Sequence, residues 1–228
     1  MMYRYFIQPQ VNMVNNNLIG YELLMKAYTA DGWRPPACFG DIPVHTIADV
    51  LVATTSHLRL KVPSVSVNLN RTQLLDPEVN TALIKAQNYL RPVRLVVELT
   101  EEEVDRDIQF AQLLPQIERY LERGMELSLD DVDSGDNDLA HVKALLPYAR
   151  EIKFALQNFP DGLEDPRLHQ RVEFWRDLAH ERNLRFILEG IEDRHDDEVA
   201  TNLGIDLRQG YYYGKPHLLQ LTPSDPKR

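Results

Sequence analysis

The sequence predicts an α/β fold, a TIM-like (β/α)8 barrel with an antiparallel first strand. Three observations support this prediction. Eight short runs are rich in β-branched and aromatic residues, which gives them the composition and length of strands. Segments with helical periodicity separate most of these runs, and such alternation is typical of a mainly parallel sheet. The first two runs are joined by an Asn-rich turn at 14–17, which favours an antiparallel pair.

The expected strands recur along the whole chain. They span residues 3–7, 18–25, 65–69, 93–99, 125–131, 151–156, 184–190 and 205–213. From the third strand onward the intervals are about the length of one strand plus one helix, which is the repeat of a parallel barrel. An open doubly wound sheet is the alternative architecture, because the same alternation also permits it.

Three stretches between these strands have the periodicity of amphipathic helices, at 44–60, 105–124 and 165–183. The second has one apolar face and ends at Gly124, a residue suited to a C-terminal cap. Pro115 lies inside it and should kink the helix or move its start, because proline lacks the backbone N–H.

The chain has 228 residues, which suits one domain, and we expect a single barrel over residues 1–220 followed by a frayed tail at 221–228. A net charge of −10 argues against a polymeric nucleic-acid partner, which needs a basic surface. No stretch approaches the roughly 20 apolar residues of a membrane span. Cys38 is the single cysteine, so no intrachain disulfide can form, and we expect a cytoplasmic protein that does not enter a membrane.

Acidic, amide and lysine side chains stand at the carboxyl ends of seven expected strands. In order they are Glu22, Asn68, Glu98, Asp130 with Asp131, Lys153, Glu189 and Gln209. A parallel barrel brings these strand ends together at one mouth, where such enzymes keep their chemistry. One acid at a strand end is usually a helix cap or half of an ion pair. Carboxylates gathered at one mouth, however, would repel one another unless cations lay between them.

The donor types indicate which cations these would be. Carboxylate and amide oxygens are hard ligands that suit Mg²⁺ or Mn²⁺, whereas the seven histidines lack the HxxxH spacing of a zinc site. Two ions that share a carboxylate clamp a phosphodiester for in-line attack, and the adjacent pair Asp130 and Asp131 is a natural bridge. Lys153 would orient or deprotonate the attacking water, because a lysine near metal ions is pushed toward its neutral form. Gln209 would hold water or substrate.

Short motifs surround these residues in a fixed order. They are FIQPQ with Gln8, GYELLMK with Glu22 and Lys26, VSVNLN with Asn68, VELTEEE with Glu98 and Glu101, LSLDDVDSG with Asp130 and Asp131, IKF with Lys153, LEGIE with Glu189 and Glu192, and QGYYYGKP with Gln209. In these motifs the chain resembles the EAL domain, the cyclic di-GMP-specific phosphodiesterase of bacteria, over nearly its whole length.

The resemblance implies a (β/α)8 barrel with an antiparallel first strand that binds cyclic di-GMP across its mouth and opens one phosphodiester to give linear pGpG. It implies two Mg²⁺ or Mn²⁺ ions. Their ligands would be Glu22, Asn68, Glu98 and Asp130 for the first, and Asp130, Asp131 and Glu189 for the second. The remaining roles carried over are Lys153 at the nucleophilic water, Glu192 and Gln209 in support of it, Gln8 and Lys26 at the substrate, and Glu101 as the anchor of the loop after strand five. A homodimer is a further family-based expectation.

Three departures from the family pattern keep other functions open. Lys26 stands where the family has arginine, which loses a bidentate grip on phosphate. Val132 and Asp133 replace Phe-Gly, which removes a permissive backbone position. Ala155 stands where an aspartate follows the lysine by two residues. A catalytically weak or silent receptor for cyclic di-GMP is therefore an alternative to the enzyme. A pure protein-interaction module is the third reading, although it would be expected to lose the metal ligands first.

Two groups of aromatic residues call for separate interpretations. In Tyr211–Tyr213, strand alternation should turn two rings toward or against the barrel, so we favour core packing over base stacking. Trp33 lies in an expected loop, where it could cover one guanine, but a single loop aromatic is weak evidence for a ligand contact. The acid-rich stretch 192–198 reads as the solvated start of a helix.

Overall fold

The computed structural model describes residues 1–228 except 37–38, 40–41, 101–106, 135–138, 160–161 and 227–228. Cys38 and Glu101 therefore lie outside the described residues. The strands are β1 (Met2–Asn12), β2 (Asn17–Thr29), β3 (Gly32–Arg34), β4 (Ser64–Leu69), β5 (Arg94–Leu99), β6 (Glu126–Leu129), β7 (Glu151–Ala155), β8 (Arg185–Glu189), β9 (Leu207–Gln209) and β10 (His217–Leu218). The helices are α1 (Val44–Leu58), α2 (Arg71–Leu75), α3 (Pro77–Leu90), α4 (Phe110–Glu122), α5 (Leu139–Val142), α6 (Pro166–Glu181) and α7 (Arg194–Asn202), with 3-10 turns η3 (Leu156–Asn158) and η4 (Gly162–Glu164).

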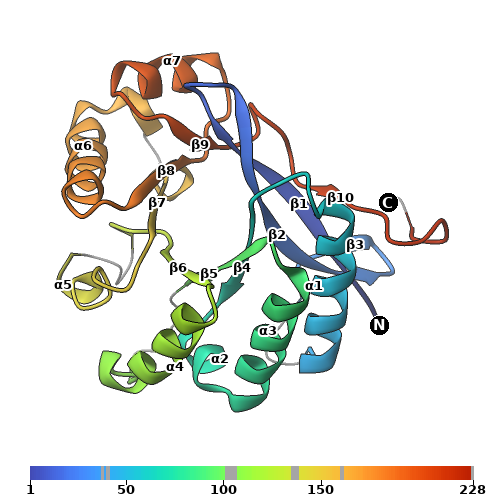
Figure 1. Ribbon diagram of the computed structural model, residues 1–228. Helices are drawn as coiled ribbons and strands as arrows, with labels where there is room; N and C mark the ends of the chain where they lie inside the picture. The colour runs from blue at the N-terminus through green and yellow to red at the C-terminus, as the bar shows by residue number, and fades with distance from the viewer. Residues whose placement is uncertain (37–38, 40–41, 101–106, 135–138, 160–161, 227–228) are drawn as a thin grey trace.

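Eight of the strands form a closed barrel, as the sequence predicted. Strands β2, β4, β5, β6, β7, β8 and β9 pair in parallel in that order, and β1 closes the ring by pairing antiparallel with both β2 and β9. The turn before β2 contains Asn16 with φ of 54°, a left-handed conformation that asparagine tolerates. Helices surround the ring on its outside (Figure 1). Closure through β1 excludes the open doubly wound sheet.

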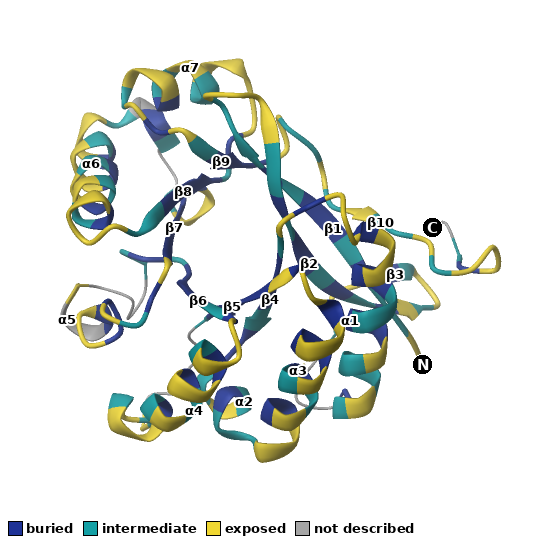
Figure 2. Cartoon of the chain, in the orientation of Figure 1, coloured by how far each residue is buried: buried dark blue, intermediate teal, exposed yellow. Residues whose placement is uncertain are grey.

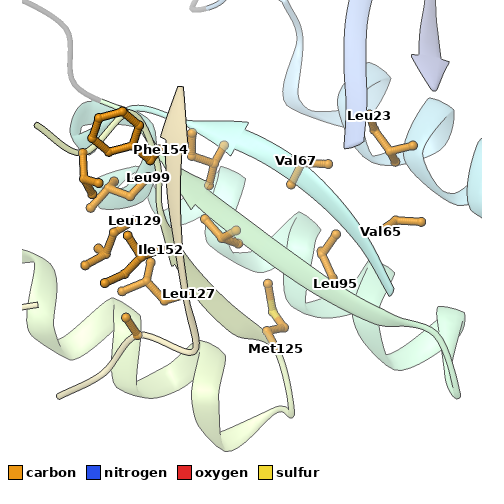
Figure 3. Packing of buried hydrophobic residues seen from close by; sticks show 14 of the residues in the cluster. Leu23, Val65, Val67, Leu95, Leu99, Met125, Leu127, Leu129, Ile152 and Phe154 are labelled. Atoms are coloured by element: carbon orange, nitrogen blue, oxygen red, sulfur yellow. The ribbon is translucent and has the colours of Figure 1, made fainter. Parts of the chain in front are cut away.

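The core lies between the barrel strands and the surrounding helices. Successive residues of a strand point to opposite faces, so Leu95, Val97 and Leu99 of β5 pack outward while Glu98 faces the interior of the barrel. Neighbouring strands add equivalent apolar rows, seen as sticks in Figure 3. The helices bury one face against these rows and expose the other to solvent (Figure 2). Burial on both faces explains why these strands read as near-continuous apolar runs.

The predicted helices are present with shifted boundaries. Helix α4 begins at Phe110 because Gln109 caps its amino end, so it starts later than expected and continues through Pro115. Gly124 follows this helix with φ of 79°, as expected of a left-handed cap. Asp165 caps α6 by accepting a hydrogen bond from the N–H of Arg167. Across the described residues, no helix has both the length and the apolar content needed to cross a membrane.

The expectation of a frayed tail is wrong for its described part. Asp225 is buried and accepts two hydrogen bonds from Arg4, at 2.9 and 2.7 Å. The carbonyl of Pro226 accepts a further bond, at 2.8 Å, from the indole of Trp33. Trp33 is therefore only 7% exposed and packs edge-on against Phe6, rather than covering a ligand from a loop.

The strand expected at 205–213 ends at Gln209, and the three tyrosines form a turn. Tyr211 and Tyr212 are 51% and 45% exposed, so the expectation that two rings pack in the core is wrong. Tyr213 alone is half-buried, and its hydroxyl donates a hydrogen bond to Asp197. The chain leaves the sheet here because Gly210 lies against the backbone of the residue Ile191.

Candidate functional site

The two ends of the barrel interior differ in net charge: the charges balance at the amino ends of the strands, and acids are in excess at the carboxyl ends. At the amino ends of β5 to β8, two arginines and two glutamates form a ladder of ion pairs. Arg94 meets Glu126 at 2.5 Å, and Arg185 meets Glu126 at 2.6 Å and Glu151 at 2.9 Å. This end is self-neutralised, which suits a structural role. At the carboxyl ends, four acids surround a single lysine.

Lys153 lies at the centre of the carboxyl-end cluster and is fully buried. Its Nζ lies 2.5 Å from Glu189, 3.0 Å from Glu98, 3.3 Å from Asp130 and 3.7 Å from Glu22. These side chains come from five strands or strand ends, and each follows the inward-facing register of its strand. Four carboxylates that far apart in the sequence therefore converge within 3.7 Å of one nitrogen atom.

Two amide side chains, one from β4 and one from β9, hold Glu22 in place. Its Oε1 accepts a hydrogen bond from Asn68 Nδ2 at 2.9 Å, and its Oε2 accepts one from Gln209 Nε2 at 2.5 Å. The same Gln209 nitrogen lies 3.3 Å from Gln8 Oε1. Gln8 stands directly opposite Glu22 in the antiparallel register of β1 and β2. The first and last strands of the barrel thus meet at this carboxylate.

The electrostatics of the cluster follow from its burial and its shared cation. Burial alone would lower the pKa of Lys153, but the surrounding carboxylates raise it well above its usual value, so the side chain is a cation here. Burial raises the pKa of Asp130 to about 6 and that of Glu98 well above its usual range, despite the opposing effect of Lys153. Glu22 is different, because Lys153 and its amide donors outweigh burial and lower its pKa.

The donor set fits a divalent cation, although the acids are arranged around the lysine. Within the described residues no three His, Cys, Asp or Glu side chains form a ready coordination group. Glu98 Oε1 already lies 3.0 Å from the Lys153 ammonium, but Oε2 has no hydrogen-bond partner in the same part of the chain. Buried carboxylate oxygens without hydrogen bonds are costly and attract cations. Only hard oxygen donors are offered, which suits Mg²⁺ and Mn²⁺.

A cavity of about 360 Å³ opens above this cluster. It is lined by Glu22, Asp130, Glu189 and Gln209, and at its rim by Asp131. The residues Gln8 and Glu192 complete the predicted members of its lining. The rest of the wall was not among the predicted site residues, and it consists of Leu24, Gln157, Gly190, Gly210, Tyr211 and Pro216.

A second cavity of about 300 Å³ adjoins the first and shares Leu24, Tyr211 and Pro216 with it. Lys26 lines this second cavity, with its Nζ 4.3 Å above the ring centre of Phe6. Partial burial and the neighbouring Arg34 lower the pKa of Lys26. The lysine therefore stands beside the acidic cavity rather than within it.

The departures from the family pattern have clear structural settings. Ala155 is completely buried and pairs with Glu189 in the register of β7 and β8, so a carboxylate is missing beside the cluster. Asp133 has φ of 69°, the left-handed conformation that a glycine would adopt freely. Gly190 was not singled out from the sequence, but its φ is 78° and an added Cβ would lie 2.3 Å from Gln157 Oε1.

The chain matches the family model described as EAL domain over residues 3–216. It is 27% identical over 222 residues to the "Probable cyclic di-GMP phosphodiesterase PdeB" of Escherichia coli (strain K12), an alignment that covers 91% of this chain and 41% of that protein. It is 31% identical over 156 residues to the "Cyclic di-GMP phosphodiesterase PdeR" of the same organism, covering 67% of this chain and 23% of that protein. The chain thus spans less than half the length of either relative.

Solved structures share the barrel. The "PaMucR Phosphodiesterase, c-di-GMP complex" superposes with a TM-score of 0.76 at 26% identity, covering 95% of this chain and 97% of that chain. The "Klebsiella pneumoniae BlrP1 pH 8.0 calcium/cy-diGMP complex" gives a TM-score of 0.79 at 19% identity, covering 96% of this chain and 56% of that chain. At that identity the second likeness is one of fold.

Proposed function

Because this chain belongs to the EAL domain family, we propose that it hydrolyses one phosphodiester of cyclic di-GMP to give linear pGpG, with divalent cations at its acidic mouth. The observation that carries this proposal is the convergence of four carboxylates on the single nitrogen atom of Lys153. Relatives named as cyclic di-GMP phosphodiesterases and a related structure in complex with c-di-GMP support the choice of substrate.

We assign Mg²⁺ or Mn²⁺ as the cations, and a related structure that contains calcium supports a divalent ion in general. The proposed ligands are Glu22, Asn68, Glu98 and Asp130 for the first ion, and Asp130, Asp131 and Glu189 for the second. When bound, the two ions would polarise the phosphoryl group and neutralise the charge that develops on it.

The other side chains at the mouth of the barrel would orient Glu22 and the attacking water. Asn68 and Gln209 hold the two oxygens of Glu22 in fixed directions, so this carboxylate is oriented before any ligand arrives. Lys153 lies within 3.7 Å of four carboxylates, so we give it the role of orienting or deprotonating the attacking water. Glu192, at the rim, and Gln209 would support the same water.

The two adjoining cavities suit an elongated ligand with two phosphates. The acidic cavity would take the scissile phosphodiester, with Gln8 beside it. Lys26 in the second cavity would meet the other end of the ligand as a point charge. Tyr211 and Pro216 form the ridge that both cavities share.

Ala155 favours a second candidate, a receptor that binds cyclic di-GMP without turning it over. Because Ala155 is buried next to Glu189, the cluster has one carboxylate fewer than the family pattern. This loss would weaken the binding of cations more than the contacts with the guanine bases of the ligand. A single domain at 1–220 with a tail at 221–228, a homodimer, and a cytoplasmic location are further proposals that come from the sequence alone.

One experiment separates enzyme from receptor. Purified protein is incubated with cyclic di-GMP and Mn²⁺, pGpG is followed by chromatography, and binding is measured by calorimetry. The enzyme predicts linear product that disappears in Glu22→Ala and Lys153→Ala but persists in the exposed-site controls Glu122→Ala and Lys85→Ala. Binding without product supports the receptor. Neither binding nor product would contradict both and favour a protein-interaction module.

A further inference from the structure

The loop that follows β6 has an unusual backbone. Asp131 and Asp133 both have positive φ, at 50° and 69°, and they flank the fully buried Val132. Left-handed conformations cost aspartate more than glycine, although aspartate tolerates them better than most residues because its side chain can hydrogen-bond locally. Two of them in three residues mean that this segment, which we call the β6 loop (residues 130–134), is held by its neighbours.

Contacts near Asp131 account for the first half of the β6 loop. Asn158 Nδ2 donates a hydrogen bond to Asp131 Oδ1 at 2.8 Å. The N–H of Val132 donates to the carbonyl of Lys153 at 3.2 Å, which ties the loop to β7. Ser134 then closes a turn, because its N–H and its hydroxyl both donate to the carbonyl of Asp131, at 3.2 and 2.7 Å. Asn158 thus holds the carboxylate of Asp131, and the turn that Ser134 closes holds the main chain that carries it.

Asp133 lies within this turn. Arg171 of α6 binds both its carboxylate and its main-chain carbonyl. Arg171 Nε donates to Asp133 Oδ2 at 2.5 Å, and its terminal nitrogen donates to the carbonyl of Asp133 at 2.8 Å. The guanidinium lies 4.4 Å from the ring centre of Phe159, which stacks on Phe154 of β7. The arginine is thus fixed at one end to the barrel wall and at the other to the loop backbone.

We propose that Arg171 is a positioning residue that fixes Asp131 at the rim of the acidic cavity and thereby sets the affinity for the second divalent cation. The inference rests on the proposed function, because it takes Asp131 as a ligand of that ion. The ion pair is partly exposed, at 44% and 24% of the two side chains, so it contributes little to overall stability. Its effect is geometric: a planar fork that binds side chain and main chain of one residue restricts that residue to one conformation.

The test is a calorimetric titration of the full chain with MnCl₂. Wild type should bind two ions in separable steps. Arg171→Ala should weaken the second step by about 10–100-fold, the usual effect of removing a partner that orients a metal ligand, and leave the first step unchanged. Arg171→Lys should fall between them, because lysine keeps the charge but not the fork. The control Arg119→Ala removes the same charge from an exposed helix position and should match wild type.

A double-mutant cycle with Asp133→Ala adds a second criterion, since variants that break the same clamp should weaken the second step no further in combination than singly. Wild-type behaviour in a folded Arg171→Ala would overturn the proposal, and so would an equal loss of both steps. If Arg171→Ala fails to fold, Arg171→Lys with an unchanged second step would overturn it instead. Binding of fewer than two ions by wild type would refute the proposed two-ion site itself, which separates that failure from failure of the clamp alone.

Discussion

Replacing Lys153 by methionine would remove the cation around which four acidic side chains gather. Methionine is also long and unbranched, so the packing changes little while the charge disappears. Both Lys153 and Glu98 are completely buried, and solvent cannot screen the carboxylates that would be left behind. We therefore expect the metal-free protein to lose stability.

The size of the loss follows from the burial of the cluster. Breaking a buried ion pair by removing one partner costs about 3–5 kcal/mol. For a chain of 228 residues, 1 kcal/mol corresponds to a change in Tm of roughly 2–4 °C. The Lys153→Met variant should then melt about 6–20 °C below wild type in the presence of EDTA.

Scanning calorimetry in EDTA and then in Mn²⁺ measures both parts of this prediction. Divalent cations would supply the missing positive charge, so Mn²⁺ should raise the Tm of Lys153→Met by more than it raises that of wild type. The control Lys85→Met, at an exposed position, should follow wild type in both conditions. Equal Tm values in EDTA together with equal gains in Mn²⁺ would refute the reasoning that this lysine is the counter-ion of the mouth.

Three further predictions concern the tail, the cluster and the last strand. The Arg4 guanidinium holds the pKa of Asp225 well below its usual range, so the pair stabilises the fold above about pH 4 and the contribution is lost as the pH falls below that value. In urea unfolding, the free energy of unfolding should fall less for Arg4→Ala than for wild type when the pH is lowered from about 5 to about 3. An equal fall in both proteins would contradict the assignment. Ala155→Asp adds a buried carboxylate, which should lower the Tm in EDTA and raise the rate of pGpG formation with Mn²⁺; an unchanged rate would show that Ala155 does not limit turnover. Gly210→Ala would place a Cβ 2.0 Å from the carbonyl oxygen of Ile191, and a cost of about 3 kcal/mol is expected in denaturant titrations; a cost under about 0.5 kcal/mol would contradict it.

The barrel and the order of its strands were predictable because local patterns encode them. A strand buried on both faces requires an apolar run, and β5 and β7 are buried along nearly their whole length. Polar residues that interrupt such runs at the inward-facing register must lie in the barrel interior. This is why Glu98 and Lys153 could be placed at one mouth before the fold was known.

The errors fall where distant segments decide the outcome. Trp33 is buried by Pro226, 193 residues further along the chain, and no local pattern reports that contact. Tyr211 is exposed because Gly210 must lie against the backbone of Ile191 and the strand ends there. The sequence pattern of a segment indicates whether it is a helix or a strand, but not how far distant segments bury its side chains.

The contacts of the β6 loop could not be predicted from the sequence for the same reason. Asp133 and Arg171 are 38 residues apart, and an acid in a loop and an arginine on a helix are each ordinary surface residues. The substitution of glycine by Asp133 could be noticed, and it indicated a changed loop. The arginine that compensates for it could not be identified without the fold.

The meeting of Gln8 and Gln209 at Glu22 joins residues 201 positions apart, so the ring closes only when its final strand arrives. During synthesis from the amino end, β1 and β2 would pair early and leave one edge of β1 open until β9 and then β10 emerge from the ribosome. Until then the nascent chain lacks both its last sheet partner and a complete mouth. The barrel is therefore expected to close only near the end of synthesis, through contacts between residues far apart in the sequence. A chain shortened before Gln209 should expose an unpaired strand edge that is prone to aggregation.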